Sequence, residues 1–358
     1  MNDYGDVLVT GGAGFIGCAL AQRLAGRAGR WVAFDSLHPQ VHATHERPDA
    51  LPEAAELVVG DVTSADDWDA LLAGFTPTTV IHLAAETGTA QSFTESTRHA
   101  MVNVVGTAAM LDAFTRRGAF PERFVLSSSR AVYGEGEWVT ADGSVIHPGV
   151  RSREQLERGE WDVPGATPRP SSAARTQPAP INVYGATKLA QENILSAWSG
   201  ARGLTLDILR LQNVYGPGQS LSNPYTGIVS LFSRLARAGE TIPVYEDGDI
   251  TRDFVYIDDV VGAFAAAIDQ PGTAGERRFD VGSGTPSTIL ELAREIAGFH
   301  GAPEPVITGR YRDGDVRYAA CDISDTLARL DWTPAWSLKD GVASLQGWIE
   351  SRSDAGAA

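Results

Sequence analysis

Short apolar runs alternate with helix-like stretches through the first half of the chain. The runs are residues 7–9, 31–34, 57–59, 80–83 and 124–126, with a further one at 206–209 after a helix-like stretch at 185–198. Apolar strands separated by helices are typical of βαβ units, in which helices cover both faces of a parallel sheet. The pattern therefore predicts an α/β fold with a doubly wound parallel sheet.

Two regions interrupt this alternation. Residues 135–180 carry six prolines among scattered charges, which predicts an irregular surface insert. Residues 212–252 contain Gly-Pro-Gly and Asn-Pro turns before a helix-like stretch. We expect a sheet domain in residues 1–211, with residues 253–271 returning to it, and a smaller C-terminal α/β domain from residues 212–252 and 272–350.

A glycine-rich segment joins the first predicted strand to the first predicted helix. Gly11, Gly14 and Gly17 are three residues apart, and Phe15 and Ile16 begin the helix. Glycines here allow a tight turn and the close approach of a pyrophosphate, which the free N–H groups of the helix N-terminus can bind. The segment predicts a Rossmann-type dinucleotide site, although a glycine turn without a ligand also fits these residues when taken alone.

Acidic residues follow the second and third predicted strands. Asp35 stands eighteen positions after Gly17, where a carboxylate can accept hydrogen bonds from an adenosine ribose and repel a 2′-phosphate. We therefore expect NAD rather than NADP, while a cap or turn role for Asp35 stays open. Asp61, before Val62, can accept from the adenine amino group, but a simple turn explains it nearly as well.

A phenol and an ammonium lie on one face of a predicted helix. Tyr184 and Lys188 are four residues apart, a spacing that makes side chains neighbours on a helix. A lysine cation beside a tyrosine stabilises the phenolate and lowers the phenol's pKa towards the range needed for proton abstraction. An accidental pair on a solvated face would explain a single match of this kind.

Three serines end the predicted strand at 124–126. Ser127, Ser128 and Ser129 lie at the carboxyl end of a central strand, where open α/β sheets bind ligands. A hydroxyl there can share the proton of a reacting alcohol. A polar strand terminus is the alternative, but the glycine turn, Asp35 and the Tyr/Lys pair occur with the serines in one chain.

With these motifs the sequence resembles the extended short-chain dehydrogenase/reductase family, specifically its nucleotide-sugar epimerases and dehydratases. The resemblance covers nearly the whole chain. It also rests on five further segments: residues 82–85 (His-Leu-Ala-Ala), Asn103 in Asn-Val-Val-Gly-Thr, residues 210–217 (Arg-Leu-Gln-Asn-Val-Tyr-Gly-Pro), residues 252–255 (Arg-Asp-Phe-Val) and residues 312–315 (Arg-Asp-Gly-Asp).

The resemblance implies roles for individual residues. The catalytic set would be Ser129, Tyr184 and Lys188. NAD would be bound by Gly11, Gly14, Phe15, Ile16, Gly17, Asp35, Asp61, Val62, Leu83, Ala84, Ala85, Asn103, Ser127, Tyr184 and Lys188. The nucleotide sugar would contact Thr87, Ser129, Arg130, Asn213, Asn223, Arg252 and Arg312, of which Asn213, Arg252 and Arg312 fall where the family holds the diphosphate. Residues 1–211 would then be the NAD-binding domain.

The residues after Ser129 separate the reactions of this family. The dehydratases carry an Asp-Glu pair there, the acid and base that expel water, whereas this chain has Arg130 and Ala131. Without this acid the rate of water loss should fall by a factor of roughly 10²–10⁴. We therefore expect that the chain does not catalyse dehydration. Residues 212–227 and 246–248 are similar to the dTDP-L-rhamnose 4-epimerase subgroup, which implies interconversion of dTDP-L-rhamnose and dTDP-6-deoxy-L-talose through a transient 4-keto sugar.

Three alternatives stay open. A dTDP-4-keto-6-deoxysugar reductase would use the same triad once with exchangeable NADPH, and another dTDP- or UDP-hexose could be the epimerised sugar. A non-catalytic NAD-binding sensor would not need the intact Ser129, Tyr184 and Lys188. Members of the subgroup often have cysteine pairs in the insert, which this chain lacks.

Composition limits the partners. A net charge of −16 argues against nucleic acid, which needs a basic surface. Two cysteines, no long apolar run and an acidic start predict a cytoplasmic protein without a membrane anchor. The seven histidines have no metal-ligand spacing, so we expect no metal. The family resemblance implies a homodimer through helices that include residues 103–117 and 185–198, and we expect the 135–180 insert to close over the sugar as a lid.

Overall fold

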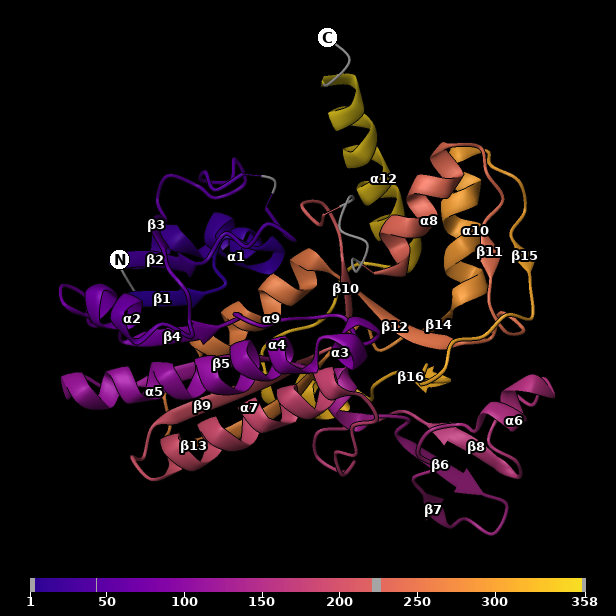
Figure 1. Cartoon of the computed structure of the whole chain (residues 1–358), viewed down its shortest axis with the longest axis horizontal. Coiled ribbons are helices and arrows are strands. Elements are labelled where there is room, and N and C mark those ends of the chain that lie inside the picture. The colour runs from indigo at the N-terminus through magenta and orange to yellow at the C-terminus, as the bar shows by residue number, and fades with distance from the viewer. Residues whose placement is uncertain (1–3, 43, 221–226, 356–358) are drawn as a thin grey trace.

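A parallel sheet of seven strands forms the centre of the larger part of the molecule (Figure 1). The computed structural model describes residues 4–42, 44–220 and 227–355. The strand order is β13-β9-β5-β4-β1-β2-β3, so the chain reverses direction across the sheet between β1 and β4. The predicted doubly wound, Rossmann-type α/β fold is confirmed. The strands are β1 (Asp6–Thr10), β2 (Arg30–Asp35), β3 (Glu56–Val59), β4 (Thr79–His82), β5 (Arg123–Ser129), β9 (Thr205–Leu211) and β13 (Gly275–Val281).

Helices cover both faces of this sheet, which explains why its strands read as continuous apolar runs. Val7 and Val9 of β1 belong to the core on one face, and Leu8 between them belongs to the core on the other. The helices packed on these two cores are α1 (Phe15–Leu24) and α9 (Ile257–Asp269) on the first face, and α2 (Ala65–Leu72), α5 (Gly106–Arg117) and α7 (Val183–Gly200) on the second. Short helices α3 (Gln91–Thr94) and α4 (Ser96–Ala100) lead into α5.

A second, smaller unit lies beyond the carboxyl ends of the central strands (Figure 1). Its sheet has the order β10-β12-β14, with β16 also paired to β12, and β11 pairs separately with β15. The strands are β10 (Asn213–Tyr215), β11 (Pro243–Val244), β12 (Thr251–Tyr256), β14 (Pro286–Thr288), β15 (Val306–Ile307) and β16 (Tyr318–Ala319). The helices are α8 (Ile228–Arg237), α10 (Ile289–His300) and α12 (Leu338–Ala355), while α11 (Ser324–Arg329) packs on β13 of the central sheet.

Strand pairing divides the chain differently from the predicted domain boundaries. β13, inside the 272–350 piece assigned to the substrate domain, pairs in parallel with β9 as the edge of the central sheet. β12, which crosses the predicted boundary between residues 252 and 253, pairs with β10 and β14 of the smaller unit along its whole length, while α9 after it packs on the central sheet. β13 is not an apolar run, because it contains the charged residues Glu276, Arg277 and Arg278. The pattern of apolar runs therefore did not predict it.

The 135–180 insert is not irregular, and this prediction was wrong. It forms a three-stranded antiparallel sheet, β7-β6-β8, from β6 (Glu137–Thr140), β7 (Val145–Ile146) and β8 (Ala166–Arg169), together with α6 (Arg153–Glu157). Asp142-Gly143 makes the β6–β7 turn, with Gly143 at φ +84°, and Asp-Gly between two strands is a strong hairpin signal. Trp138 of β6 is buried.

Helix α7 approaches the turn after β5 so closely that it needs a glycine. That turn is a 3₁₀ helix, Arg130–Tyr133, and a Cβ at Gly185 would overlap the carbonyl oxygen of Ala131 and lie 3.1 Å from the Cβ of Pro180. Gly200, at the other end of α7, has no atom within 4 Å of such a Cβ. The contact at Gly185 sets how far Tyr184 stands from Ser129.

We therefore predict opposite outcomes for two Gly→Ala substitutions in one helix. Gly185→Ala should lower the free energy of unfolding by roughly 1–3 kcal/mol through overpacking. Gly200→Ala should leave it unchanged or raise it by up to about 1 kcal/mol, because alanine favours helix over glycine. Chemical denaturation of both variants beside the wild type measures this, and equal stabilities for the two would contradict the close approach.

Candidate active site

The predicted glycine turn is held against the end of β4. Gly11 has φ +66°, and a Cβ there would lie 2.9 Å from the backbone nitrogen of Ala84 and 3.1 Å from the carbonyl carbon of Leu83. A Cβ at Gly17 would lie 2.6 Å from the backbone of Gly12. Three predicted cofactor residues thus meet at the point where the strand order reverses, the usual ligand crevice of such sheets.

The N-terminus of α1 is built to accept an anion. Gly14 is its N-cap, no side chain caps the helix, and its first turn, which contains Phe15 and Ile16, has no acidic residue. A Cβ at Gly14 would meet only the carbonyl oxygen of Gly11, at 3.3 Å, so the approach to the backbone is open. Uncapped N–H groups beside an open glycine fit the pyrophosphate of a dinucleotide.

Asp35 ends β2 next to this turn. Its two carboxylate oxygens accept hydrogen bonds from the backbone nitrogens of Ala13 (3.0 Å) and Leu37 (2.9 Å). Each oxygen keeps a second lone pair, which suits a ribose hydroxyl. The carboxylate is therefore held at the strand end and can still accept a hydrogen bond from a ligand.

Asp61 has a turn role in the structure. It is exposed, and its Oδ1 accepts from the backbone nitrogen and the hydroxyl of Thr63, both at 2.8 Å. Val62 after it is buried under Gly106. The bonds are those of the simple turn, and an adenine contact of Asp61 stays a prediction.

Tyr184 and Ser129 meet at the carboxyl end of β5. Tyr184 lies in the first turn of α7, where the side chain of Asn182 caps the helix by accepting from the backbone nitrogen of Gly185. Burial raises the pKa of the Tyr184 phenol, whereas a side-chain hydrogen bond with Ser129 and the positive charge of Arg130 lower it. Ser129 also accepts from the backbone nitrogen of Ala131 at 3.1 Å. The predicted catalytic hydroxyl and base are thus brought together.

Lys188 begins a buried chain of polar side chains. Its Nζ donates to Oε1 of Gln191 at 2.5 Å, and Nε2 of Gln191 lies 3.0 Å from the hydroxyl of Thr107 and 3.2 Å from Nε2 of His82. Nδ1 of His82 lies 2.6 Å from the hydroxyl of Thr10 at the end of β1. Burial lowers the pKa of Lys188 to about 7 and that of His82 to about 3. Lys188 is therefore tied to the cofactor strand through neutral groups.

Asn103 positions the loop after β4. It lies in a π-helical turn, Met101–Val105, a feature frequent at functional sites. Its Oδ1 accepts from the backbone nitrogen of Glu86 (2.7 Å), and its Nδ2 donates to the Glu86 carbonyl (3.0 Å) and the Thr187 hydroxyl (2.9 Å). Its amide thus joins the loop to α7. Ala85 and Ser127, two other predicted cofactor residues, are half-buried in that loop and in β5.

Three of the predicted sugar contacts, Asn213, Arg252 and Arg312, lie on two strands of the smaller unit and on the loop before β16. Nε of Arg130 donates to Oδ1 of Asn213 in β10 at 2.8 Å. Nη2 of Arg252 in β12 donates to Asp315 at 2.7 Å, and the Arg312 guanidinium lies 5.0 Å from the centre of the Tyr245 ring. Thr87 is exposed after β4, and Asn223 lies outside the described residues.

These cations share their surroundings with a buried acid. Burial, and then the charge of Arg252, lower the pKa of Arg130 to about 9. Burial raises the pKa of Glu135 to about 7, against hydrogen bonds from the backbone nitrogens of Arg317 and Tyr318. The cluster is suited to an anion such as a diphosphate, because guanidinium groups match phosphate oxygens bidentately.

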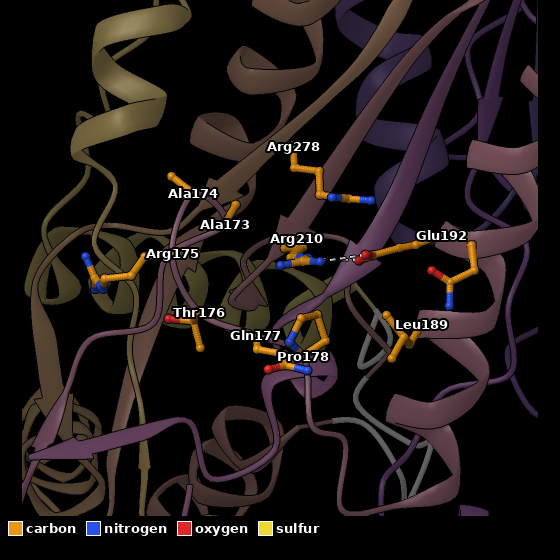
Figure 2. Close-up of a pocket in the computed structure, with 11 residues that line it drawn as sticks. Ala173, Ala174, Arg175, Thr176, Gln177, Pro178, Leu189, Glu192, Arg210 and Arg278 are labelled. Atoms are coloured by element: carbon orange, nitrogen blue, oxygen red, sulfur yellow. Dashed lines mark hydrogen bonds and ion pairs between the residues drawn. The ribbon is translucent and has the colours of Figure 1, made fainter. Parts of the chain in front are cut away.

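A cavity of about 350 Å³ lies on the other side of α7 (Figure 2). Residues 173–178 of the insert, Leu189 and Arg278 line it, and Arg210 and Glu192 meet at its back. Glu192 accepts from Nε and Nη2 of Arg210 at 2.9 and 2.7 Å, and from the Ser128 hydroxyl at 2.5 Å. The pair is a support for the catalytic strand end rather than a part of the cofactor crevice.

Within the described ranges, no cluster of three or more His, Cys, Asp or Glu side chains is arranged to hold a metal ion. No helix in the same ranges is both long and apolar enough to cross a membrane.

Comparison with known proteins agrees with this geometry. Residues 7–282 match the model of the NAD dependent epimerase/dehydratase family. The chain belongs to this family. The predicted membership of the extended short-chain dehydrogenases/reductases is confirmed.

Members of the family match the chain over nearly its whole length. It is 60% identical to a dTDP-L-rhamnose 4-epimerase of Burkholderia thailandensis, over 97% of this chain and 96% of that protein. The UDP-glucose 4-epimerase of Thermotoga maritima, solved with UDP-glucose, superposes with a TM-score of 0.78 at 27% identity and covers 97% and 99% of the two chains. The Thermus thermophilus UDP-glucose 4-epimerase, solved with NAD, superposes with a TM-score of 0.75 at 26% identity. That match covers 96% of this chain and 99% of the other.

Several residues of this family member's site were not predicted from its sequence. The side chains of Glu192 and Arg210 meet only through the folded α7–β9 contact, since eighteen positions separate them. Gln191 instead contacts Lys188 on its own helix, Thr107 on α5 and His82 on β4. Asp315 stands in the recognised Arg-Asp-Gly-Asp segment but had no predicted role. The spacing of Lys188 and Gln191, three residues on one helix, is a signal that could have been used.

The buried lysine gives a direct prediction. The chain has two lysines, Lys188 and Lys339, so a protein labelled with ¹³Cε-lysine has two side-chain NMR signals. With burial lowering its pKa to about 7, Lys188 should lose its proton as the pH rises through neutrality. We expect one signal to titrate near pH 7 in the ligand-free protein and to vanish in Lys188→Met. If that signal persists in Lys188→Met, or if neither signal titrates between pH 6 and 8, then burial does not lower the pKa of Lys188 as proposed.

Proposed function

We propose that the chain is an NAD-dependent nucleotide-sugar 4-epimerase that interconverts dTDP-L-rhamnose and dTDP-6-deoxy-L-talose. The observation that carries this function is the placement of the Tyr184 phenol beside the Ser129 hydroxyl at the carboxyl end of β5, because it puts a proton acceptor and a second hydroxyl in the ligand crevice. The 60% identity to a dTDP-L-rhamnose 4-epimerase over nearly the full length supports the choice of sugar.

Tyr184 acts as the base. Its phenolate oxygen takes the proton from O4 of the sugar, and the Ser129 hydroxyl donates to that same oxygen of the sugar and orients it. On return, Tyr184 gives the proton back to O4 of the inverted sugar. Lys188, one turn along α7, supplies positive charge that favours the phenolate.

The crevice side of the sheet holds the cofactor. Gly11, Gly14 and Gly17 with the N-terminus of α1 bind the pyrophosphate, and Asp35 accepts from the adenosine ribose. The chemistry that bound NAD would supply here is the removal of a hydride from C4 of the sugar and its return to the opposite face of the keto sugar. The NAD-dependent family and neighbours solved with NAD support this.

The opposite wall holds the nucleotide sugar. Arg252, Arg312 and Asn213 bind the diphosphate, while Arg130 lies between this group and Tyr184. Binding through the diphosphate leaves the hexose free to rotate. This suits epimerisation, because the keto sugar has to present both faces of C4 to the nicotinamide. Thr87 and Asn223 complete the proposed sugar contacts.

We further propose that the two units are an NAD-binding and a substrate domain, and that two chains pair through α5 and α7. Met101 and Val105, exposed apolar residues just before α5, support an interface there. Both cysteines are buried free thiols, which suits a reducing cytoplasm.

Asp35 should make the protein select NAD(H) over NADP(H). A 2′-phosphate would lie beside a carboxylate that two backbone N–H groups already hold in place, and like charges repel. Fluorescence titration should give far tighter binding of NADH than of NADPH, and Asp35→Ser should narrow the difference. Equal affinities for the wild type would remove Asp35 from this role.

Epimerisation should proceed without added reductant and without solvent hydrogen at C4, because the hydride leaves and returns within one site. With dTDP-L-rhamnose in deuterated water, NMR should show a C4-inverted product with protium at C4, and Tyr184→Phe should form none. Deuterium at C4 would refute the hydride mechanism. Stoichiometric consumption of nicotinamide would favour the reductase, and inversion of UDP-sugars alone would overturn the proposed substrate.

A further inference from the structure

The insert is bonded along its length to residues 317–322, the segment that follows the proposed diphosphate-binding residue Arg312. Glu135 accepts from the backbone nitrogens of Arg317 (2.9 and 3.0 Å) and Tyr318 (3.2 Å). Further along, Ser171 donates to the carbonyl of Ala320 at 2.9 Å and its own carbonyl accepts from Asp322 at 2.8 Å. The predicted lid is therefore tied to the wall of the substrate domain, and its closing over the sugar stays a prediction.

Arg151 is the buried centre of this contact. Its side chain is 3% exposed and its two terminal nitrogens donate to the two carboxylate oxygens of Glu246 at 2.9 and 2.8 Å. The same nitrogens also donate to the carbonyls of Trp161 (3.0 Å) and Asp315 (2.9 Å). One guanidinium thus joins the insert to two separate loops of the substrate domain.

Glu246 is a fixed partner. It has φ +51°, in the left-handed region that non-glycine residues rarely adopt, and its backbone nitrogen donates to the carbonyl of Arg310 at 2.7 Å. Its carboxylate is fully buried and also accepts from Arg317 at 3.2 Å. The backbone and the carboxylate of Glu246 are both held by hydrogen bonds, and its strained backbone persists only because its surroundings fix it. Glu246 is therefore a rigid partner for Arg151.

From Arg151 the contacts lead directly to the diphosphate site. Arg151 donates to the backbone carbonyl of Asp315, and the side chain of that same residue accepts from Nη2 of Arg252 at 2.7 Å. Arg252 is nearly buried, and its other terminal nitrogen donates to the carbonyl of Thr251 at 2.8 Å. The orientation of its guanidinium therefore depends on where Asp315 stands.

We propose that Arg151 is a positioning residue for nucleotide-sugar binding, which holds Asp315 and through it the Arg252 guanidinium in place to bind the diphosphate. The inference rests on the proposed function for the identity of the ligand. It gives the insert a role in binding, because the insert supplies a cation that fixes the substrate domain's anion site without touching the ligand. A purely structural role would instead affect stability alone.

Three insert variants test the role. Arg151→Met removes the guanidinium, Arg151→Lys keeps the charge without the bidentate fork, and Arg158→Met is the control, since Arg158 is an exposed insert arginine paired only locally with Glu160. Calorimetry with dTDP as the probe, and separately with NAD, measures the two sites. We expect the affinity for dTDP to fall about tenfold or more in Arg151→Met, which corresponds to the loss of roughly one charge-assisted hydrogen bond. The fall should be smaller in Arg151→Lys. NAD affinity and the control should not change.

Steady-state kinetics adds a second readout. A misplaced diphosphate grip should raise KM for the nucleotide sugar and leave kcat nearly unchanged, because the lost interaction is equal in ground and transition states. Unchanged dTDP affinity in Arg151→Lys and in a folded Arg151→Met would overturn the proposal. So would equal weakening of NAD and dTDP, which marks general destabilisation. If Arg151→Met does not fold, Arg151→Lys decides alone.

The two proposals fail separately. If the wild type binds UDP and not dTDP, the proposed substrate is wrong, and the same variants are then compared with UDP. Both nucleotides carry the diphosphate, so the comparison still tests Arg151.

Discussion

The ion pair between Arg210 and Glu192 holds the catalytic helix α7 to β9, the strand paired with β5. Both side chains are almost completely buried, and two hydrogen bonds at 2.9 and 2.7 Å join β9 to α7. Breaking such a pair is costly because the remaining charge stays buried without a partner, a loss of roughly 3–5 kcal/mol. Glu192 follows Lys188 by one helical turn and also accepts from Ser128, the neighbour of Ser129. The position of the lysine relative to the serine is thus set by one carboxylate.

The same network reaches the insert from the cofactor side. The Arg210 guanidinium lies 4.9 Å from the centre of the Tyr133 ring, and the Tyr133 hydroxyl donates to Asp280 of β13 at 2.7 Å. Asp280 also accepts from the backbone nitrogen of Ala173, at the end of the insert, at 2.5 Å. The insert is therefore bonded to the central sheet at one end and, through Arg151, to the smaller unit. Because it connects the two walls of the crevice, it limits how far they can separate.

Local signals carried most of what the sequence could predict. The apolar runs, the glycine turn and the Tyr184–Lys188 spacing each lie within one strand, turn or helix, so their geometry follows from a few consecutive residues. The edge strand β13 was missed because four of its residues are charged, and the insert hairpin was missed because the many prolines outweighed the Asp142-Gly143 signal. The partners of Gln191 and Arg151 depend on packing between distant segments, which no local spacing encodes.

The residue after Ser129 decides which chemistry this frame supports. Arg130 stays a cation at neutral pH, since burial lowers its pKa only to about 9, and it donates to Asn213 rather than to a leaving group. A guanidinium cannot deliver a proton as a carboxylic acid does, so assisted loss of a hydroxyl has no donor at this position. Its charge instead lowers the pKa of Tyr184 and lies near Arg252 on the side proposed for the diphosphate. A carboxylate pair here would oppose both a phenolate and an anionic substrate, so the cation favours reversible proton transfer at O4 over elimination.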